Sequence, residues 1–272
     1  MAKRKKKSTA GNMSIDDMRK MINGQAGMNV AHNLEEDNPT DVKEWIPTGS
    51  TWLDSIICKG KKAGIPIGKI VEIAGLESTG KSYMAAQIAA NAQKMGIDVI
   101  YFDAESAIDS KFVRKIGVDV NKMIYVQATS VEFVMETIEA LLGSNENRML
   151  FIWDSLAFTP ALSDIEGDYN PNSSMAVKAR VLSKAMTKLT IPIANAESTL
   201  LVLNQLKTNI PTGPNAHIVA MTTPYVTPGG KSMTYGYSLR IWLTGRKAKS
   251  SFVVDDNNFR IGSEVKVKLE KS

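Results

Sequence analysis

The sequence predicts an α/β fold in which a mainly parallel, twisted sheet is flanked by helices on both faces. Beyond about residue 43, apolar runs of strand length alternate with segments of helical periodicity. The runs are apolar at nearly every position, which is typical of parallel strands buried on both faces. A chain of 272 residues with 43% hydrophobic content can fill one such core. The expected strands are 70–74, 99–102, 123–126, 149–153, 200–203, 239–243 and 265–269.

Residues 1–42 are predicted to form a basic, partly disordered arm, and residues 43–272 to form the core. The run from Lys3 to Lys7 supplies the entire net charge of +5, and the remaining 28 Lys and Arg residues balance 28 Asp and Glu residues. The charge of the core therefore gives no indication of a nucleic-acid partner, and the run itself would add only a salt-sensitive attraction to phosphate backbones. A short helix is expected over 14–22, capped by Ser14.

A single cysteine, Cys58, excludes an internal disulfide and a cysteine-cluster zinc site, and we expect it to be a packing residue. No run approaches the roughly 18 apolar residues of a membrane span, and the N-terminus is too polar for a signal peptide. We therefore expect a soluble, cytoplasmic protein with no membrane partner.

Residues 75–82 match the phosphate-loop pattern G-x-x-x-x-G-K-[ST], between an apolar strand and a helical stretch over 83–95. In such a loop, backbone N–H groups point inward at phosphates, Lys81 reaches the outer phosphates and Ser82 faces magnesium. A glycine turn before a core helix is the structural alternative. The residues expected to bind a nucleoside triphosphate are Gly75, Leu76, Glu77, Ser78, Thr79, Gly80, Lys81 and Ser82.

Three further expected strands end in polar residues, and ligands bind at the carboxyl ends of parallel strands. Asp154 is placed to hold magnesium, directly or through water, unless it only caps the next turn. Strand alternation puts Asp103 and Glu105 on one face, where one carboxylate could polarise the attacking water. The run 200–203 ends at Asn204-Gln205, where an amide could contact the terminal phosphate.

Two long polar segments, 160–174 and 207–231, follow two of these strand ends. Loops of this length in a compact domain are usually functional or disordered, and both leave the sheet on the nucleotide side. A ligand bound there could therefore be coupled to triphosphate hydrolysis.

Beyond the phosphate loop, the motifs form an ordered series from about residue 46 to the C-terminus. Its further blocks are Pro47-Thr48-Gly49-Ser50, Gly68-Lys69-Ile70-Val71-Glu72-Ile73, Phe102-Asp103-Ala104-Glu105-Ser106-Ala107-Ile108-Asp109, Asp154-Ser155, Ile165-Glu166-Gly167, Asn204-Gln205, Gly229-Gly230 and Gly262-Ser263-Glu264. In content and spacing the series resembles the core of the RecA recombinase family of bacteria and phages, apart from a longer segment between Gln205 and Gly229.

The resemblance implies a RecA-like phosphate-loop ATPase that uses ATP and Mg²⁺. Glu105 matches the family's catalytic glutamate, and Gln205 matches the residue that senses the terminal phosphate and couples it to DNA. With Lys81 they form the expected catalytic set. Ser82 and Asp154 match the residues associated with the metal.

The same resemblance extends the site to adenine and to a neighbouring subunit. Asp109 and Phe112 match the positions that contact and stack on adenine, with Phe in place of the family's Tyr. Lys271 aligns with one of two lysines that reach into the adjacent subunit's ATP, and Tyr235 aligns with an aromatic residue at the subunit interface. A homo-oligomer, in this family a helical filament, is therefore expected.

The two long polar segments match the family's DNA-binding loops, so single-stranded and double-stranded DNA are the expected partners. Arg180 matches an arginine on the DNA phosphates. Thr187 stands where the family has a second arginine, and either Lys184 or Lys188 is expected to replace it. The expected DNA-binding residues are Ile165, Gly167, Arg180, Lys184, Lys188, Lys207, Gly229, Gly230 and Lys231.

The chain departs from the family pattern at both ends. It stops after the expected 265–269 strand, before the family's last core segment and C-terminal domain. Its arm offers only the short helix over 14–22, where the family has a long oligomerisation helix. We expect either a fragment of a longer protein or a shortened phage-type version with weaker filament contacts.

Together these features predict an ATP-dependent DNA recombinase that forms a filament on single-stranded DNA and promotes homologous pairing and strand exchange in recombination and repair. Its activity would be DNA-dependent ATP hydrolysis. Another motor on the same core, a ring helicase or a clock-type ATPase, would explain the nucleotide residues but not the blocks at 165–167 and 229–230. A non-catalytic ATP- and DNA-binding module is the second alternative. A small-molecule kinase lacks support because no Arg-rich lid segment is present.

Overall fold

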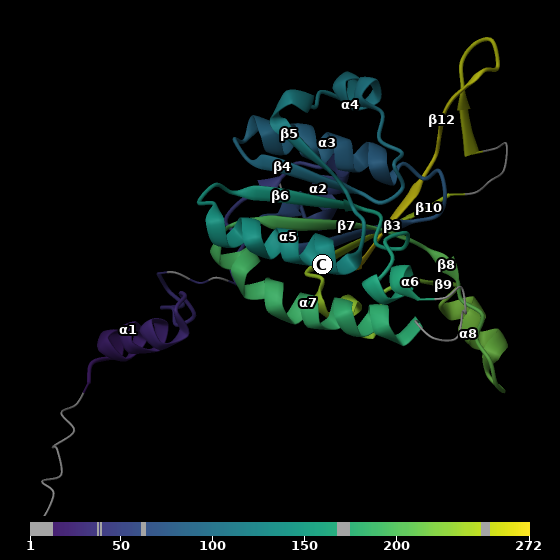
Figure 1. Ribbon diagram of the computed structural model, residues 1–272. Coiled ribbons are helices and arrows are strands. Elements are labelled where there is room, and N and C mark those ends of the chain that lie inside the picture. The colour runs from purple at the N-terminus through teal and green to yellow at the C-terminus, as the bar shows by residue number, and fades with distance from the viewer. Residues whose placement is uncertain (1–12, 37, 39, 61–63, 168–174, 246–250) are drawn as a thin grey trace, which may run out of the picture. The chain divides into compact units, whose positions relative to one another are not determined.

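The computed structural model describes residues 13–272 except 37, 39, 61–63, 168–174 and 246–250 (Figure 1). The chain divides into two compact units, residues 1–41 and residues 42–272. The basic run predicted to be a tail lies outside the described residues. No helix in the described ranges is both long and apolar enough to cross a lipid bilayer.

The described part of the N-terminal unit contains helix α1 (Ile15–Ala26). The Ser14 hydroxyl caps it by accepting a hydrogen bond from the Asp17 N–H at 3.1 Å, as predicted. The helix continues beyond the predicted end at residue 22 and stops at Gly27, which adopts a left-handed conformation with φ of 66°.

The core unit is built on a seven-stranded sheet with the strand order β13-β10-β3-β7-β6-β4-β5. Its strands are β3 (Ile70–Gly75), β4 (Asp98–Asp103), β5 (Met123–Gln127), β6 (Met149–Asp154), β7 (Thr199–Gln205), β10 (Leu239–Thr244) and β13 (Lys266–Lys271). Neighbouring strands run parallel except β10 and β13, which are antiparallel. The predicted fold and the seven predicted strands are therefore confirmed.

Helices cover both faces of this sheet (Figure 1). One face carries α2 (Thr51–Ile57), α3 (Lys81–Lys94) and α4 (Ser110–Ile116); the other carries α5 (Val131–Ser144), α7 (Met175–Asn195) and α9 (Lys231–Gly236). Each face has its own hydrophobic core, because alternate residues of the central strands point to opposite faces. Cys58 is partly buried against the first core, which confirms its prediction as a packing residue.

The two edge strands differ from the prediction. The five central strands are buried along nearly their whole length, whereas β5 and β13 are largely exposed. On these strands Ile124 is 57% exposed and Val267 is 40% exposed. The expectation of burial on both faces is wrong here, because an apolar run does not reveal where its strand lies in the sheet.

Short elements occupy both segments that were predicted as long loops. The first contains α6 (Leu162–Glu166), and its residues 168–174 lie outside the described ranges. The second contains α8 (Ala216–Thr222) between the antiparallel strands β8 (Lys207–Thr208) and β9 (Tyr225–Val226). Figure 1 shows these elements gathered at the end of the sheet that the carboxyl ends of β6 and β7 reach.

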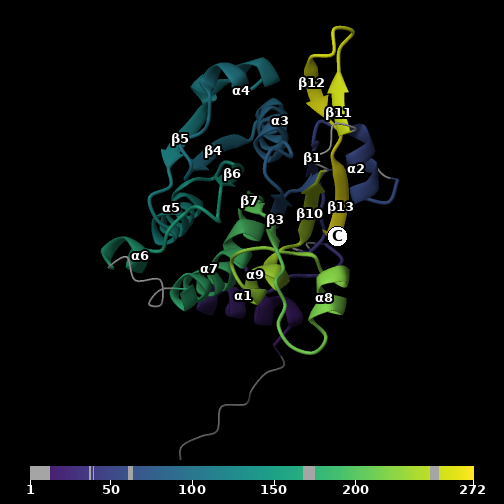
Figure 2. The ribbon, with the colours of Figure 1, turned by 90° about the vertical axis from the view of Figure 1, so that its right-hand side faces the viewer.

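The remaining short elements lie before β3, before β5 and between β10 and β13. They are β1 (Trp45–Ile46) with its antiparallel partner β2 (Ile65–Pro66), the 3₁₀ turn η1 (Val120–Lys122), and the hairpin of β11 (Phe252–Val254) and β12 (Arg260–Ser263). Figure 2 shows the hairpin projecting beyond β10 and β13.

Candidate functional site

The phosphate loop connects β3 to α3 at the carboxyl edge of the sheet. Gly75 ends β3, and a Cβ atom there would lie 2.5 Å from the Thr79 hydroxyl and 3.1 Å from the Leu243 side chain. Gly80 has φ of 85°, a conformation that glycine adopts without strain, directly before α3 begins at Lys81. The shape of the turn therefore requires both glycines of the motif.

The two neighbouring strands hold this loop. The Leu76 N–H donates to the Leu243 carbonyl of β10 at 3.1 Å, and the Leu206 N–H, just after β7, donates to the Gly75 carbonyl at 3.1 Å. Within the loop, the Thr79 hydroxyl donates to the Leu76 carbonyl at 2.8 Å. The loop is held in shape by its own protein contacts, and such preorganisation lowers the entropic cost of binding a ligand.

The Lys81 amino group lies against the inside of the loop. Its Nζ donates to the carbonyl oxygens of Gly75 at 3.3 Å and Leu76 at 3.1 Å. Burial lowers the pKa of Lys81, and nearby carboxylates, Asp154 foremost, oppose that effect. The amino group thus lies at the loop, where it would meet an anion bound by this motif.

Asp154, at the end of β6, contacts the first turn of α3. Its Oδ2 accepts hydrogen bonds from the Ser82 hydroxyl at 2.8 Å and from the Tyr101 hydroxyl of β4 at 2.7 Å. Burial raises the pKa of the Asp154 carboxyl, and these two hydrogen bonds oppose the effect. The structure therefore brings Ser82 and Asp154 into direct contact. Sequence reasoning missed Tyr101, whose only signal is a hydroxyl within an otherwise apolar run.

The turn after β4 presents Glu105, whose Oε1 accepts a hydrogen bond from the Ser155 hydroxyl at 2.6 Å. Asp103, by contrast, is 3% exposed, and its carboxylate accepts hydrogen bonds from the N–H groups of Glu105, Ala107 and Ile108. Because β4 ends at Asp103, strand alternation does not continue to Glu105. The expectation that both carboxylates share a face is therefore wrong, since Asp103 organises the turn that carries Glu105.

A cavity of about 740 Å³ lies over these groups, within the usual range for small-ligand sites. Of the predicted residues, the phosphate loop apart from Leu76, together with Glu105, Phe112, Asp154 and Gln205, lines this cavity. The position of Gln205 follows from the sheet order, in which β7 lies between β3 and β6. Residues from four separate strand ends therefore meet around one hollow.

Aromatic residues contribute to the lining of the cavity. The ring of Phe112 on α4 lies 6.1 Å, between centroids, from the ring of Tyr83 on α3. Asp109, which is predicted with Phe112 to contact adenine, instead caps α4 by accepting a hydrogen bond from the Lys111 N–H at 2.8 Å. The structure brings Phe112 into the described lining of the cavity and leaves Asp109 outside it.

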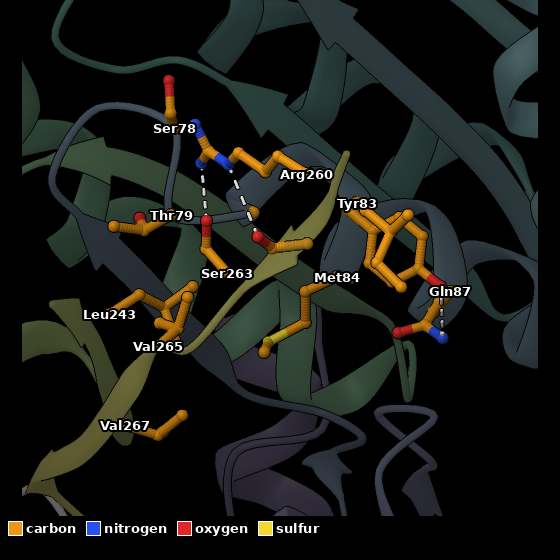
Figure 3. Close-up of a pocket in the computed structure, with 13 residues that line it drawn as sticks. Ser78, Thr79, Tyr83, Met84, Gln87, Leu243, Arg260, Ser263, Val265 and Val267 are labelled. Carbon is orange, nitrogen blue, oxygen red and sulfur yellow. Dashed lines mark hydrogen bonds between the residues drawn. The ribbon is translucent and has the colours of Figure 1, made fainter. Parts of the chain in front are cut away.

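A second cavity of about 610 Å³ lies between the phosphate loop, α3 and the strands β12 and β13 (Figure 3). Its walls are mainly apolar, with Met84 from α3, Leu243 from β10 and Val267 from β13. The Arg260 guanidinium also borders it and donates a hydrogen bond to the Ser263 hydroxyl. Sequence reasoning missed this cavity, because it depends on the return of β12 and β13 to α3, which no local motif signals.

The basic residues predicted on α7 have different surroundings. Arg180 and Lys184 are exposed. Lys188 forms an ion pair with Glu139 of α5, with 2.6 Å between Nζ and Oε2. Of the two lysines expected to replace the family's second arginine, Lys188 thus already has a carboxylate partner.

Gly229 and Gly230 pack close to α7. A Cβ atom on Gly230 would lie 3.5 Å from the Ala179 side chain, which precedes Arg180 in the sequence. Both glycines adopt positive φ, 112° and 85°, so the turn depends on their conformational freedom. The other residues predicted to bind DNA are exposed, and they are Ile165 and Gly167 at α6, Lys207 on β8 and Lys231 at the start of α9.

Sequence reasoning missed Lys178 of α7, which lies among these elements. Its Nζ donates to the carbonyl oxygens of Leu156 at 2.9 Å and Ala157 at 3.2 Å, in the turn after β6. Burial lowers the pKa of Lys178, with Asp164 of α6 opposing the effect and Lys207 of β8 adding to it. Lys178 is therefore half-buried, hydrogen-bonded to the turn after β6, and close enough to feel the charges of Asp164 and Lys207 in the two polar segments.

Tyr235 and Lys271 lie together, away from the cavities. The Lys271 Nζ donates to the Tyr235 carbonyl at 2.9 Å. Lys271 pairs with Arg240 near the start of β10, whereas the phosphate loop begins beside Leu243 near the end of that strand. The two residues therefore lie at the end of β10 that is opposite to the phosphate loop of their own chain. Tyr235 is 78% exposed.

Comparison with known proteins agrees with this geometry. The family described as the RecA N-terminal domain matches residues 13–272. The chain is 34% identical to Protein RecA of Mannheimia haemolytica over 251 residues, 92% of this chain and 63% of that protein. It is 31% identical to Protein RecA of Streptomyces avermitilis over 259 residues, 95% of this chain and 64% of that protein. The chain thus spans just under two thirds of the length of these relatives. Given the family match and the parallel sheet that carries the phosphate loop, the chain belongs to the RecA family.

Proposed function

We propose that this chain is an ATP-dependent DNA recombinase whose ATP hydrolysis depends on DNA. The observation that carries the proposal is one cavity lined by Lys81, Ser82, Glu105, Asp154 and Gln205, beside the segment that follows β7. This set offers a phosphate cradle, oxygen ligands for a metal, a carboxylate for the attacking water and an amide next to a candidate polymer-binding segment. Membership of the RecA family supports the DNA half of the proposal.

The triphosphate of ATP would lie in the phosphate loop, facing its backbone N–H groups and the N-terminus of α3. Lys81 would exchange its contacts with the loop carbonyls for contacts with the outer phosphates. This exchange favours ATP, because a charge-assisted hydrogen bond to phosphate is stronger than one to a neutral carbonyl.

Ser82 and Asp154 fit a magnesium ion, because both offer hard oxygen ligands and their oxygens lie 2.8 Å apart. Among the described residues, no group of three or more His, Cys, Asp or Glu side chains could hold a metal. Phosphate oxygens and water would therefore complete the coordination. When bound, Mg²⁺ would supply neutralisation of the phosphate charge.

Glu105 would orient the attacking water and take its proton. The water oxygen forms a bond to the terminal phosphorus while the bond from that phosphorus to the bridging oxygen breaks, which gives ADP and inorganic phosphate. The hydrogen bond from Ser155 holds the Glu105 carboxylate in orientation. Phe112 offers a ring face on which adenine can stack.

Single-stranded DNA would bind across α6, α7 and the segment 207–231. Exposed Arg180, Lys184 and Lys207 would contact its phosphates, so binding should be salt-sensitive and nearly independent of sequence. A double-stranded partner would be tested by base pairing with the bound strand. Gln205, between the phosphate loop and the segment 207–231, would couple the terminal phosphate to DNA.

A second copy of the chain completes the site in this proposal. Lys271 lies at the sheet edge opposite its own phosphate loop and beside the exposed Tyr235, so it could reach ATP only in a neighbouring copy. Repetition of one such head-to-tail contact produces a helical filament unless the rotation closes a ring.

The test is ATP hydrolysis with and without a long oligothymidylate, with electron microscopy of the same samples. We expect hydrolysis that rises strongly with DNA, and filaments on DNA when a slowly hydrolysed ATP analogue is present. Rings in place of filaments would favour a helicase-type motor. Absence of hydrolysis under both conditions would contradict the proposal and favour a non-catalytic binding module.

A further inference from the structure

Two opposite charges lie in the interior of the core. Glu72 in β3 is 0% exposed, and Arg240 of the adjacent β10 is 5% exposed. The Arg240 Nε donates to the Glu72 Oε2 at 2.7 Å. Burial of a charge pair carries a desolvation cost, and an apolar pair of similar volume is often at least as stable. Stability alone therefore gives no reason for a salt bridge at this position.

Asn204 extends the pair to a third strand, β7. It is 0% exposed, and its Nδ2 donates to the Glu72 Oε1 at 2.9 Å and to the Pro228 carbonyl at 3.0 Å. Its Oδ1 accepts a hydrogen bond from the N–H of Gln205 at 2.9 Å. One buried amide thus contacts the charge pair, the backbone of the cavity glutamine Gln205 and the far end of the segment 207–231.

Arg240 reaches the same end of that segment. Its Nη2 donates to the Thr227 hydroxyl at 3.0 Å. Thr227 and Pro228 directly precede the pair Gly229–Gly230, which packs close to α7. The buried network of Glu72, Asn204 and Arg240 therefore holds the end of the segment by two hydrogen bonds, one from each of two strands.

The residues of the network are also close in sequence to residues that line the 740 Å³ cavity at the phosphate loop. Glu72 precedes Gly75 on the strand that enters the phosphate loop, and Asn204 directly precedes Gln205. Hydrogen bonds are directional and, in a low-dielectric interior, strong, so a shift of one strand end changes the others. The network is thus placed to sense both the cavity and the segment.

We infer that Glu72, Asn204 and Arg240 are positioning residues that make the placement of residues 227–230 depend on nucleotide. The inference rests on the proposed function and adds a buried route to the one through Gln205. All three side chains are buried, so DNA and ATP would not touch them. Their effect is on the coupling between the two ligands.

The first test is Thr227→Val, which removes the hydroxyl that accepts from Arg240 and preserves the shape of the side chain. The affinity for a slowly hydrolysed ATP analogue would be measured with and without oligothymidylate, and the affinity for oligothymidylate with and without the analogue. Coupling factors are typically about 5- to 150-fold. We expect the coupling factor of the variant, which is the ratio of its affinities for one ligand with and without the other, to fall at least about threefold.

Two further variants separate coupling from folding. Thr137→Val makes the same chemical change on α5, where the Thr137 hydroxyl donates to the Phe133 carbonyl, and should leave coupling unchanged. The double variant Glu72→Met/Arg240→Met replaces the charge pair with an apolar pair. Thermal unfolding would verify that each variant folds, and hydrogen exchange of residues 225–231 would show whether the nucleotide analogue still protects them.

The outcomes distinguish this inference from the proposed function. Absence of coupling in the wild-type chain would contradict the proposed function itself. Wild-type coupling that persists in folded Thr227→Val, with nucleotide-dependent protection of 225–231 intact, would overturn the inference alone. Loss of both in Thr227→Val, but not in Thr137→Val, would support it, and a double variant that folds should show the same loss.

Discussion

The nucleotide cavity and the surface assigned to DNA adjoin each other but are built in opposite ways. In the cavity, side chains at strand ends are held by short contacts, such as Ser82 with Asp154 and Ser155 with Glu105. On the DNA side, Arg180 and Lys184 extend from the exposed surface of a helix. In the proposed function, the first region would select a small ligand by fixed geometry, and the second would attract a polymer by charge. Substitutions should therefore have large effects in the cavity and graded, salt-dependent effects on the DNA surface.

The largest expected effect is that of Lys81→Ala. Loss of the only amino group in the described cavity lining leaves the outer phosphates without their cationic partner, so hydrolysis should fall below detection and ATP should bind more weakly. Lys94→Ala, which removes an exposed lysine from the same helix, is the matched control and should retain activity. Measurable turnover by Lys81→Ala would mean that the phosphate loop is not the reaction site.

Glu105→Gln should have the next largest effect. A carboxylate that positions and deprotonates water typically contributes about 10² to 10⁴ in rate, so turnover should fall by that factor while ATP and DNA binding persist. Glu136→Gln makes the same change on the exposed surface of α5 and should have no effect. Steady-state hydrolysis beside equilibrium binding separates the two quantities. Normal turnover by Glu105→Gln would remove this residue from the catalytic set.

Arg180→Ala tests the other side of the comparison. The substitution should weaken the binding of single-stranded DNA of every sequence by about tenfold, since a hydrogen bond to a charged group contributes roughly 1.5 kcal/mol. The slope of the logarithm of affinity against the logarithm of salt concentration should also become shallower by about 0.7, which corresponds to one lost phosphate contact. Lys188→Ala should lose less than Lys184→Ala, because Lys188 is already paired with Glu139. A larger loss for Lys188→Ala, measured by fluorescence anisotropy at several salt concentrations, would invert the assignment.

The smallest expected effect belongs to Tyr101→Phe. The variant loses one hydrogen bond to Asp154, worth about 1 kcal/mol, so the Mg²⁺ concentration for half-maximal binding of an ATP analogue should rise about fivefold. Tyr125→Phe removes a hydroxyl that donates to Asp103 at the end of β4, and it should leave the Mg²⁺ dependence unchanged. Equal Mg²⁺ dependence of Tyr101→Phe and wild type would show that Tyr101 does not orient Asp154.

The sequence was most informative where function depends on consecutive residues. The phosphate loop, the strand before it, the helix after it, and the contact of Ser82 with Asp154 follow from a local motif and the rule that ligands bind at strand ends. The structure adds what depends on neighbours in space. Tyr101 reaches Asp154 only because β4 lies next to β6. Asp103 accepts hydrogen bonds from the turn that follows it because the strand ends there.

The same reason explains the other differences. Lys178 and the buried pair of Glu72 and Arg240 carry no motif, since their partners lie on different elements. The exposure of β5 and β13 depends on their place in the strand order, which apolar periodicity does not contain. Local pattern thus predicted the nucleotide region better than the connections from it to the DNA surface.

The central test is whether the two regions respond to each other through Gln205. The affinities for an ATP analogue and for oligothymidylate would be titrated in wild type and in Gln205→Ala, each with and without the other ligand. Linkage requires the two enhancements to be equal within one protein. We predict that each ligand tightens the other by the same factor in wild type, and that Gln205→Ala binds both ligands separately but loses that mutual enhancement. Undiminished enhancement in Gln205→Ala, or none in wild type, would contradict coupling through Gln205.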